Sequence, residues 1–147
     1  MPLAEFIEDV EASAAMEAKA RGIRLTVVPA QLGIAVNGDR QLLASAVGNL
    51  LSNAFKFTRP HTRVLLRTQI ASGNVRIEVE DECGGLPAGK PEELFRPFDR
   101  RGSDRSGLGL GLAISRQSVA ISGGKIEVQD LPGKGCIFSV VVPLASA

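Results

Sequence analysis

The chain has 147 residues, of which 44% are hydrophobic and 22% charged, and its formal net charge is +1. This is the composition of one globular domain with a hydrophobic core, and it excludes a disordered segment. It gives no support to nucleic-acid binding, which usually requires a large basic excess, and no apolar run reaches the roughly 18 residues of a membrane span.

The first predicted helix covers residues 3–21, where hydrophobic residues recur at helical spacing. Arg21 and Gly22 would end it. Its acidic, helical pattern is not that of a signal peptide. Two segments that follow, residues 23–28 and 33–37, alternate in hydrophobicity and therefore predict short strands.

The second predicted helix covers residues 40–57, with Asp39 as a suitable N-cap. Within it, Asn49, Asn53 and Lys56 are spaced i, i+4 and i+7, so they share one face of an otherwise apolar helix. Buried polar groups need partners. This polar stripe therefore predicts contact with water or with a polar ligand.

The remaining chain predicts two β-hairpins separated by a loop and a third helix. The ranges are 63–72 and 74–81 for the first hairpin, 107–124 for a glycine-rich turn and helix, and 125–130 and 136–143 for the second hairpin. Because strands come in consecutive pairs, we expect an α+β fold. It would be a two-layer α/β sandwich, with a mixed, mostly antiparallel sheet of about five strands and helices on one face.

Alternating glycines open the third predicted helix at Gly107, Gly109 and Gly111. Glycine lets the backbone approach a ligand closely, and a helix N-terminus presents free N–H groups that suit phosphate. No Gly-Lys-Ser/Thr follows, so this is not a Walker A loop. The pattern alone is compatible with phosphate binding, but a glycine-rich turn that binds nothing is the more common case.

A carboxylate stands at another glycine turn, where Asp81 ends a predicted strand just before Gly84 and Gly85. Such a carboxylate can accept a hydrogen bond from an exocyclic amine such as that of adenine. The alternative is local turn chemistry, in which Asp81 caps its own loop.

Together these segments resemble the ATP-binding catalytic domain of sensor histidine kinases, within the gyrase, heat-shock chaperone, histidine kinase and mismatch-repair ATPase superfamily. NLLSNAFKFT, DECGG, LFRPFDR and GLGLG look like the N, G1, F and G2 boxes of that family, in its order. GGKIEVQDLPGKGCIFSVVVPL resembles its closing hairpin. The resemblance covers about residues 20–144 and implies a Bergerat-type fold with ATP and Mg²⁺ as cofactors.

The resemblance implies roles for the polar stripe. Asn53 would hold a magnesium ion that bridges the ATP phosphates, since an amide oxygen is a suitable hard ligand. Asn49 and Lys56 would reach the phosphates or the metal shell, Lys56 as a point charge. Asp81 would bond the adenine amine.

The resemblance also implies roles in the glycine segments and between them. Gly85 would let the base approach, with Leu86 against it. Arg100 would neutralise charge during phosphoryl transfer and would thus be catalytic together with Asn49 and Lys56. The phosphates would be wrapped by the G2 segment, Gly107, Leu108, Gly109, Leu110 and Gly111.

Asn49 bears on the reaction. Members of the superfamily that hydrolyse ATP carry a glutamate there to activate water, and an asparagine cannot act as a general base near neutral pH. The residue therefore fits phosphoryl transfer to an external acceptor better than it fits ATP hydrolysis.

Both cysteines of the chain depart from the family pattern. Cys83 replaces the first G1 glycine and Cys136 replaces a small hydroxyl residue of the last hairpin. Their separation matches no metal-ligand spacing and no disulfide framework, which favours a reducing, cytoplasmic setting. We expect both thiols at the adenine end, where they either fill small spaces or, if oxidised, block nucleotide.

The sequence contains no His-Glu-x-x-x-x-Pro phosphoacceptor segment. We therefore expect residues 1–21 to be the linker helix from an upstream dimerisation and phosphoacceptor domain, and residues 22–147 to be the catalytic domain. The expected partners are that histidine domain and, downstream, a response-regulator receiver domain. We expect the isolated domain to be monomeric, without membrane contact, even if the parent protein is membrane-anchored.

Two alternatives remain at this point. One is an anti-sigma-type serine kinase, which has the same fold and another acceptor. The other is a degenerate module that binds nucleotide weakly or not at all and acts through protein interactions, as the substitutions at Cys83 and Cys136 would allow.

Overall fold

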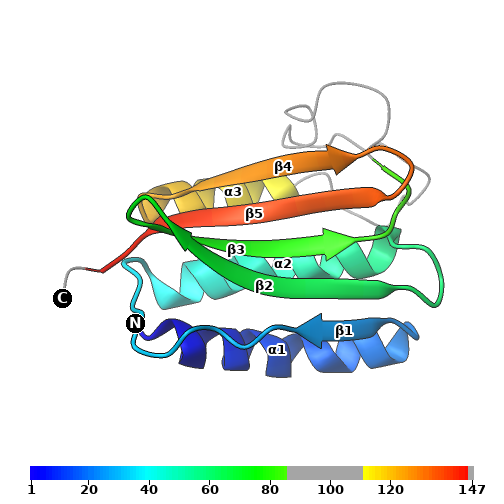
Figure 1. Ribbon diagram of the computed structural model, residues 1–147, viewed down its shortest axis with the longest axis horizontal. Coiled ribbons are helices and arrows are strands. Elements are labelled where there is room, and N and C mark those ends of the chain that lie inside the picture. The colour runs from blue at the N-terminus through cyan, green and yellow to red at the C-terminus, as the bar shows by residue number, and fades with distance from the viewer. Residues whose placement is uncertain (86–110, 146–147) are drawn as a thin grey trace.

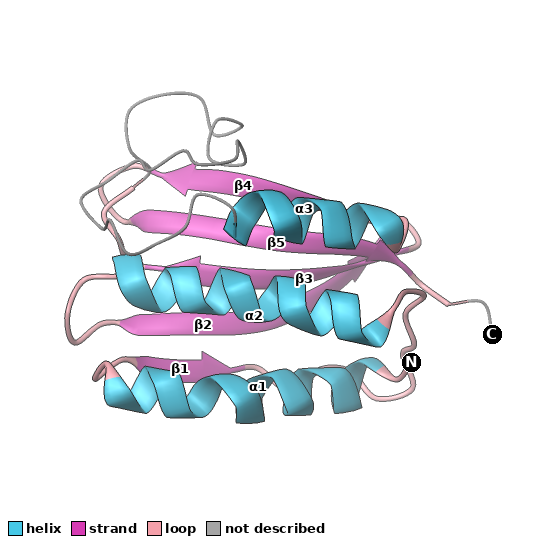
Figure 2. Cartoon of the chain, turned by 180° about the vertical axis from the view of Figure 1, so that it is seen from behind, coloured by secondary structure: helices cyan, strands magenta, loops and turns pink. Residues whose placement is uncertain are grey.

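The structure, a computed structural model, describes residues 1–85 and 111–145. Its elements are α1 (Leu3–Ala20), β1 (Arg24–Val27), α2 (Arg40–Phe57), β2 (Arg63–Ala71), β3 (Asn74–Asp81), α3 (Gly111–Ile121), β4 (Lys125–Leu131) and β5 (Gly135–Pro143). One five-stranded sheet has the order β1-β2-β3-β5-β4, in which β1 and β2 are parallel and the other neighbours antiparallel. The described helices all lie on one face of it (Figures 1 and 2). The predicted α+β two-layer fold is confirmed.

One predicted strand is wrong. Residues 33–37 form no strand, and only two isolated bridges join this segment to the rest, Pro2 with Ala35 and Val36 with Leu144. Glycines with positive φ bound the extended residues 34–37, at 80° in Gly33 and 151° in Gly38, and these turns leave too few extended residues for a ladder.

The hydrophobic core lies between the sheet and the helices. α1 places six buried residues in it, and α2 places seven, while every residue of β5 except Pro143 is buried. The largest fully buried side chains are Phe6, Leu3, Leu43, Leu50, Leu51, Leu66 and Ile77, with five valines. α1 therefore packs within the same core as the sheet.

The other face of the sheet carries ion pairs. Glu78 contacts Arg67 at 2.7 Å and Arg76 at 3.6 Å, and Arg76 also contacts Glu127 at 2.9 Å. The hydrogen bond to Glu78 raises the pKa of Arg67.

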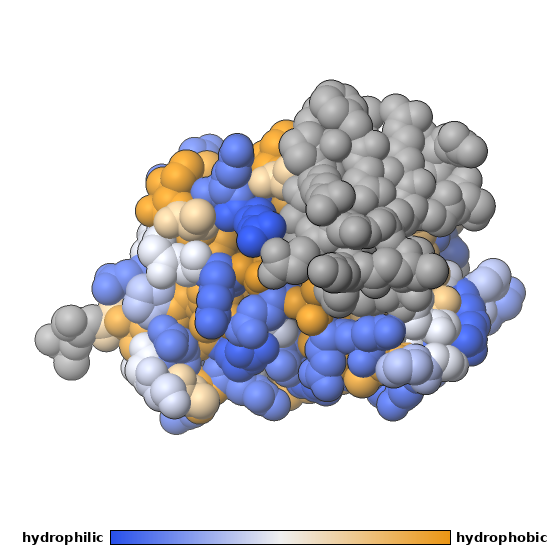
Figure 3. Space-filling view, turned by 90° about the horizontal axis from the view of Figure 1, so that it is seen from above, coloured by the Kyte–Doolittle hydropathy of each residue, from blue (hydrophilic) through white to orange (hydrophobic). Residues whose placement is uncertain are grey.

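On the face seen in Figure 3, hydrophilic and hydrophobic residues are interspersed over the described surface. None of the described helices is both long enough and apolar enough to cross a membrane.

Candidate functional site

Asn49, the first residue of the polar stripe on α2, contacts α3. Asn49 is half-buried, and its Nδ2 donates a hydrogen bond to Ser115 Oγ at 3.1 Å. Ser115 Oγ in turn donates to the carbonyl oxygen of Gly111 at 2.9 Å, at the start of α3. The two helices run side by side (Figure 2). Asn49 therefore links α2 to the first turn of α3.

Asn53 and Lys56, the other two members of the stripe, are differently placed. Both are half-buried, and within the described residues neither side chain forms a hydrogen bond or ion pair. A half-buried amide and a half-buried ammonium without protein partners suit polar ligands. The amide oxygen of Asn53 is of the kind that Mg²⁺ prefers, so this donor set fits the expected ion.

The C-terminal end of α2 is bonded to the end of β3. The backbone N–H of Glu82 donates to Thr58 Oγ1 at 3.1 Å, and the N–H of Arg59 donates to the carbonyl oxygen of Glu82 at 3.2 Å. Arg63 N–H donates to Glu82 Oε2 at 3.1 Å. These bonds join the C-terminal end of α2, which carries Lys56, to the end of β3, which carries Asp81. Figure 2 shows that these ends of α2 and β3 lie on the same side of the molecule as the start of α3.

Asp81 is buried at this end, with 3% of its surface exposed. Its Oδ1 accepts the backbone N–H groups of Cys83 at 3.0 Å and of Cys136 at 3.3 Å. Its Oδ2 accepts the Cys136 thiol at 3.4 Å. Because a carboxylate oxygen can accept more than one hydrogen bond, Oδ2 keeps capacity for a further donor.

The glycine turn after Asp81 has the backbone that the sequence predicts. Gly84 and Gly85 have φ of 98° and 115°, a region that side chains disfavour. A Cβ on Gly85 would lie 3.3 Å from Asp130 Oδ1 and 3.4 Å from the backbone nitrogen of Gly133. The glycine turn is thus packed against the turn between β4 and β5. The backbone N–H of Gly84 donates a hydrogen bond to the carbonyl oxygen of Lys134 in that turn, at 3.0 Å.

The two cysteines meet beside Asp81. Their Sγ atoms lie 3.9 Å apart, with Cys83 half-buried and Cys136 buried. The contact with Cys83 and burial raise the pKa of Cys136, while the contact with Cys136 lowers the pKa of Cys83. The expected proximity of the thiols is confirmed. The sequence spacing gave no sign that they also share a cluster with Asp81.

Several predicted residues fall outside the described residues, and their placement stays a prediction. They are Leu86, Arg100, Gly107, Leu108, Gly109 and Leu110. Gly111 is described and begins α3. Ser115 was missed by the sequence reasoning. A signal existed, since a serine four residues after Gly111 falls on the buried face of an apolar helix and needs a polar partner.

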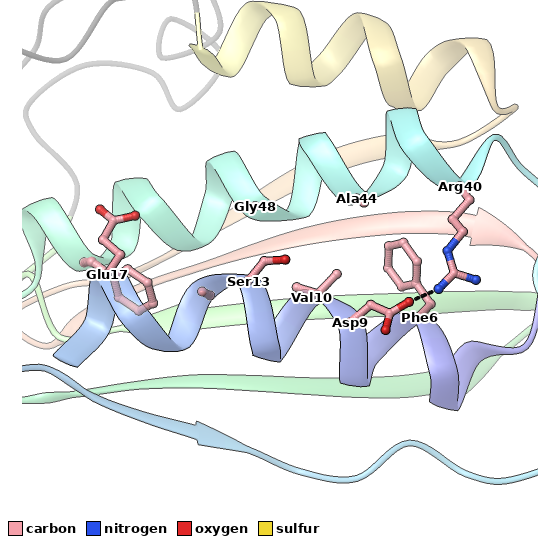
Figure 4. Close-up of a pocket in the computed structure, with 10 residues that line it drawn as sticks. Phe6, Asp9, Val10, Ser13, Glu17, Arg40, Ala44 and Gly48 are labelled. Carbon is pink, nitrogen blue, oxygen red and sulfur yellow. Dashed lines mark hydrogen bonds and ion pairs between the residues drawn. The ribbon is translucent and has the colours of Figure 1, made fainter. Parts of the chain in front are cut away.

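A different hollow, of about 160 Å³, lies between α1 and α2 (Figure 4). Phe6, Val10 and Gly48 line it, and Asp9 and Arg40 form an ion pair at its edge. Pockets for drug-sized ligands usually measure about 300–1,000 Å³, so this one is too small for a nucleotide. It also lies on the α1 side of α2, away from the Asn49–Ser115 contact.

Comparisons with known proteins agree on one family. Residues 38–146 match the model of the histidine kinase-, DNA gyrase B- and HSP90-like ATPases. The chain is 35% identical over 130 residues to the sensor protein TorS of Escherichia coli (strain K12), a match that covers 88% of this chain and 14% of TorS. The chain therefore spans only a small part of this curated relative.

Solved structures show the same likeness. The mycobacterial sensor histidine kinase MprB superimposes with a TM-score of 0.81 at 31% identity, covering 100% of this chain and 99% of that one. Full-length ShkA in complex with AMPPNP superimposes with a TM-score of 0.79 at 28% identity, covering 100% of this chain and 31% of ShkA.

Proposed function

The chain belongs to the histidine kinase-, DNA gyrase B- and HSP90-like ATPase family, and from this premise we propose that it transfers the γ-phosphoryl group of ATP to a histidine on a separate domain. Its sequence and fold are those of the ATP-binding catalytic domain of sensor histidine kinases. The accepting histidine would belong to a dimerisation and phosphoacceptor domain of the parent protein. That histidine would pass the group to a receiver domain.

The observation that supports this proposal is that α2, which carries three polar groups on one face, is hydrogen-bonded at its end to the end of β3, which carries Asp81. Asn49, Asn53 and Lys56 lie along α2, whose end is bonded to β3 beside Asp81. In the proposal Asp81 Oδ2 accepts the adenine amine and the Gly85 turn lies against the base. Asn53 would hold Mg²⁺, which supplies charge neutralisation on the phosphates when bound.

The stripe of α2 would divide the remaining work. Lys56 would place a positive charge on the phosphates. Asn49, fixed by Ser115, would orient the phosphate or metal shell without taking a proton, so water would gain no general base from it. Arg100 and the segment from Gly107 to Leu110 keep their proposed roles at the phosphates.

The test is calorimetric titration of the purified chain, under reducing conditions, with a non-hydrolysable ATP analogue in the presence and absence of Mg²⁺. We expect micromolar to sub-millimolar binding. Asp81→Asn should weaken it about tenfold or more, since a hydrogen bond to a charged group contributes about 1.5–3 kcal/mol. Asn53→Ala should make the affinity less dependent on Mg²⁺.

The control for both variants is Asp39→Asn, which keeps an oxygen at the α2 N-cap, remote from the site. Its affinity should equal that of the wild type. Absence of detectable binding by the wild type would contradict the catalytic proposal and leave the degenerate interaction module in its place. Binding without phosphorylation of any added histidine domain would instead favour another acceptor, such as a serine.

A further inference from the structure

Three groups that can bind metal converge where β3 ends. Asp81 Oδ2 lies 3.4 Å from Cys136 Sγ, and Cys136 Sγ lies 3.9 Å from Cys83 Sγ. One ligand atom from each residue lies within 4.8 Å of the others. The fold creates this cluster through strand pairing, because Asp81 and Cys136 are direct partners in the β3–β5 ladder and Cys83 follows two residues after Asp81.

These separations match those around a tetrahedral ion. With metal–sulfur bonds of about 2.3 Å and a metal–oxygen bond of about 2.0–2.2 Å, tetrahedral angles place two sulfur ligands about 3.8 Å apart and a sulfur and an oxygen ligand about 3.5–3.7 Å apart. The distances of 3.9 Å between the two sulfurs and 3.4 Å between Cys136 Sγ and Asp81 Oδ2 differ from these by about 0.1–0.3 Å. The third pair, Asp81 and Cys83, has ligand atoms within 4.8 Å of each other, so an ion could bind all three residues after these two side chains move closer together.

The backbone supports the same arrangement. Asp81 Oδ1 accepts two backbone N–H groups, which fixes the carboxylate and turns Oδ2 toward the thiols. Hydrogen-bonded carboxylates of this kind are usual in metal sites. Among the residues that the structure describes, no lysine or arginine forms an ion pair with Asp81. Cys83 is half-buried and is the member of the cluster with some exposure to solvent.

We propose that Asp81, Cys83 and Cys136 bind a thiophilic divalent cation of the Zn²⁺ class and that the bound ion excludes adenine from Asp81. Binding releases the two thiol protons and leaves the fourth position of the ion to water. The exclusion of adenine rests on the proposed function, since it requires that Asp81 Oδ2 accept the adenine amine. The metal site itself does not depend on that assignment.

The first experiment uses Co²⁺ as a spectroscopic substitute for Zn²⁺, with the whole chain kept under a phosphine reductant and without nucleotide. Thiolate ligation gives Co²⁺ an intense charge-transfer absorption, and we expect it to saturate at one ion per chain and to be displaced by Zn²⁺. Cys83→Ser and Cys136→Ser should each weaken binding by more than about 100-fold, because even changes outside the ligand shell cost 10–100-fold.

Two controls keep this result decisive. His61→Asn removes the one histidine of the chain, an exposed residue with φ of 62° that asparagine tolerates, and should leave the Co²⁺ spectrum unchanged. Circular dichroism of both serine variants should show the wild-type fold, since serine is close to cysteine in size. Equal Co²⁺ binding by the wild type and by a variant that carries both Cys83→Ser and Cys136→Ser, or no thiolate band in the wild type, would overturn the metal site.

The second experiment measures competition. One equivalent of Zn²⁺ should lower the affinity of the wild type for the Mg²⁺-bound ATP analogue at least tenfold and leave the Cys83→Ser/Cys136→Ser variant unaffected. Equal weakening in both proteins would show that Zn²⁺ acts on the nucleotide alone, and that would refute the exclusion. If the analogue bound neither protein without Zn²⁺, the proposed function would fail while the cobalt spectrum still decided the metal site.

Discussion

Asn49 has a structural contact in the fold and, in the proposed function, a chemical role as well. It donates to Ser115 Oγ at 3.1 Å and so holds the start of α3 against α2. The same amide has no basic group with which to activate water. The contact explains why the position is polar within an apolar helix, and the proposed transfer chemistry explains why it is an amide.

Asn49→Glu tests the chemical half of this argument. A glutamate would place a general base beside the proposed phosphate site, and Ser115 Oγ could donate to it in place of accepting from Asn49. We expect the release of inorganic phosphate from ATP to rise severalfold or more, since a positioned general base contributes about 10²–10⁴-fold at best. A coupled phosphate-release assay measures it.

Asn49→Gln is the matched variant, because it has the same length as glutamate and no base. Its phosphate release should stay at the wild-type level. If the glutamate and glutamine variants released phosphate equally, Asn49 would not be what separates transfer from hydrolysis in this chain.

At the level of single residues, the sequence identified the polar groups but not all of their partners. Asn49, Asn53 and Asp81 stood out because each interrupts an apolar pattern or precedes a glycine turn. Ser115 did not stand out, because its partner is 66 residues away and only the packing of α3 on α2 pairs them. The cluster of Asp81 with both cysteines also depends on strand register, which spacing along the chain does not reveal.

Two glycines show how the elements tolerate the same change differently. A Cβ on Gly135, the first residue of β5, would overlap the backbone carbonyl oxygen of Asp81 on β3. Gly48, in the middle of α2, has no atom within 4 Å of the position where a Cβ would stand. The strand position therefore requires glycine, and the helix position does not.

Gly135→Ala and Gly48→Ala should thus change stability in opposite directions. We expect Gly135→Ala to lower the free energy of unfolding by about 1–3 kcal/mol, because the clash must be relieved by moving backbone. Gly48→Ala should raise it by about 0.5–1 kcal/mol, because alanine loses less conformational freedom than glycine in a helix.

Urea titration, followed by circular dichroism, measures both changes in the free energy of unfolding from the shift of the unfolding midpoint. The dependence of that free energy on urea concentration should be the same in both variants and the wild type. The β3–β5 contact also positions Asp81. Gly135→Ala should therefore lower the affinity for the ATP analogue as well, whereas Gly48→Ala should leave that affinity unchanged. A neutral effect of Gly135→Ala would mean that the β3–β5 register beside Asp81 is looser than the structure shows.

Most elements could be predicted from local patterns. α1 and α2 follow helical periodicity, and Asp39 caps α2 as expected by accepting the N–H of Leu42 at 3.0 Å. The hairpins follow from alternation and from turns such as the one at Gly73. The segment 33–37 has the same alternation, but it forms only single β-bridges, one to Pro2 and one to Leu144. Such long-range contacts leave no signal in the local sequence.

At the scale of the whole molecule, α1 is the element whose role is most open. The sequence favours a linker helix over residues 1–21, and the family match begins only at residue 38. Yet α1 buries Leu3, Phe6 and Ile7 in the common core, and Ser52 of α2 donates to its Glu17 at 3.1 Å. If α1 is a linker, it is one that also packs as part of the core of the catalytic domain.

Phe6→Ala measures how much the fold depends on α1. Phe6 is 1% exposed and lines the α1–α2 hollow, so its removal would enlarge an existing void. We expect the free energy of unfolding to fall by about 3–5 kcal/mol, as for other buried phenylalanines. Met16→Ala, on the same helix but 81% exposed, should change it by no more than about 0.5 kcal/mol.

A chain that begins at Gly22 extends the same test. Fully burying four large side chains of α1, Leu3, Phe6, Ile7 and Val10, contributes roughly 6–12 kcal/mol at about 1.5–3 kcal/mol each, which is comparable to the total stability of a typical domain, about 5–15 kcal/mol. We therefore expect the shortened chain to show no cooperative urea transition. Cooperative unfolding of that chain, together with a small effect of Phe6→Ala, would show that α1 is a linker that packs on a domain stable without it.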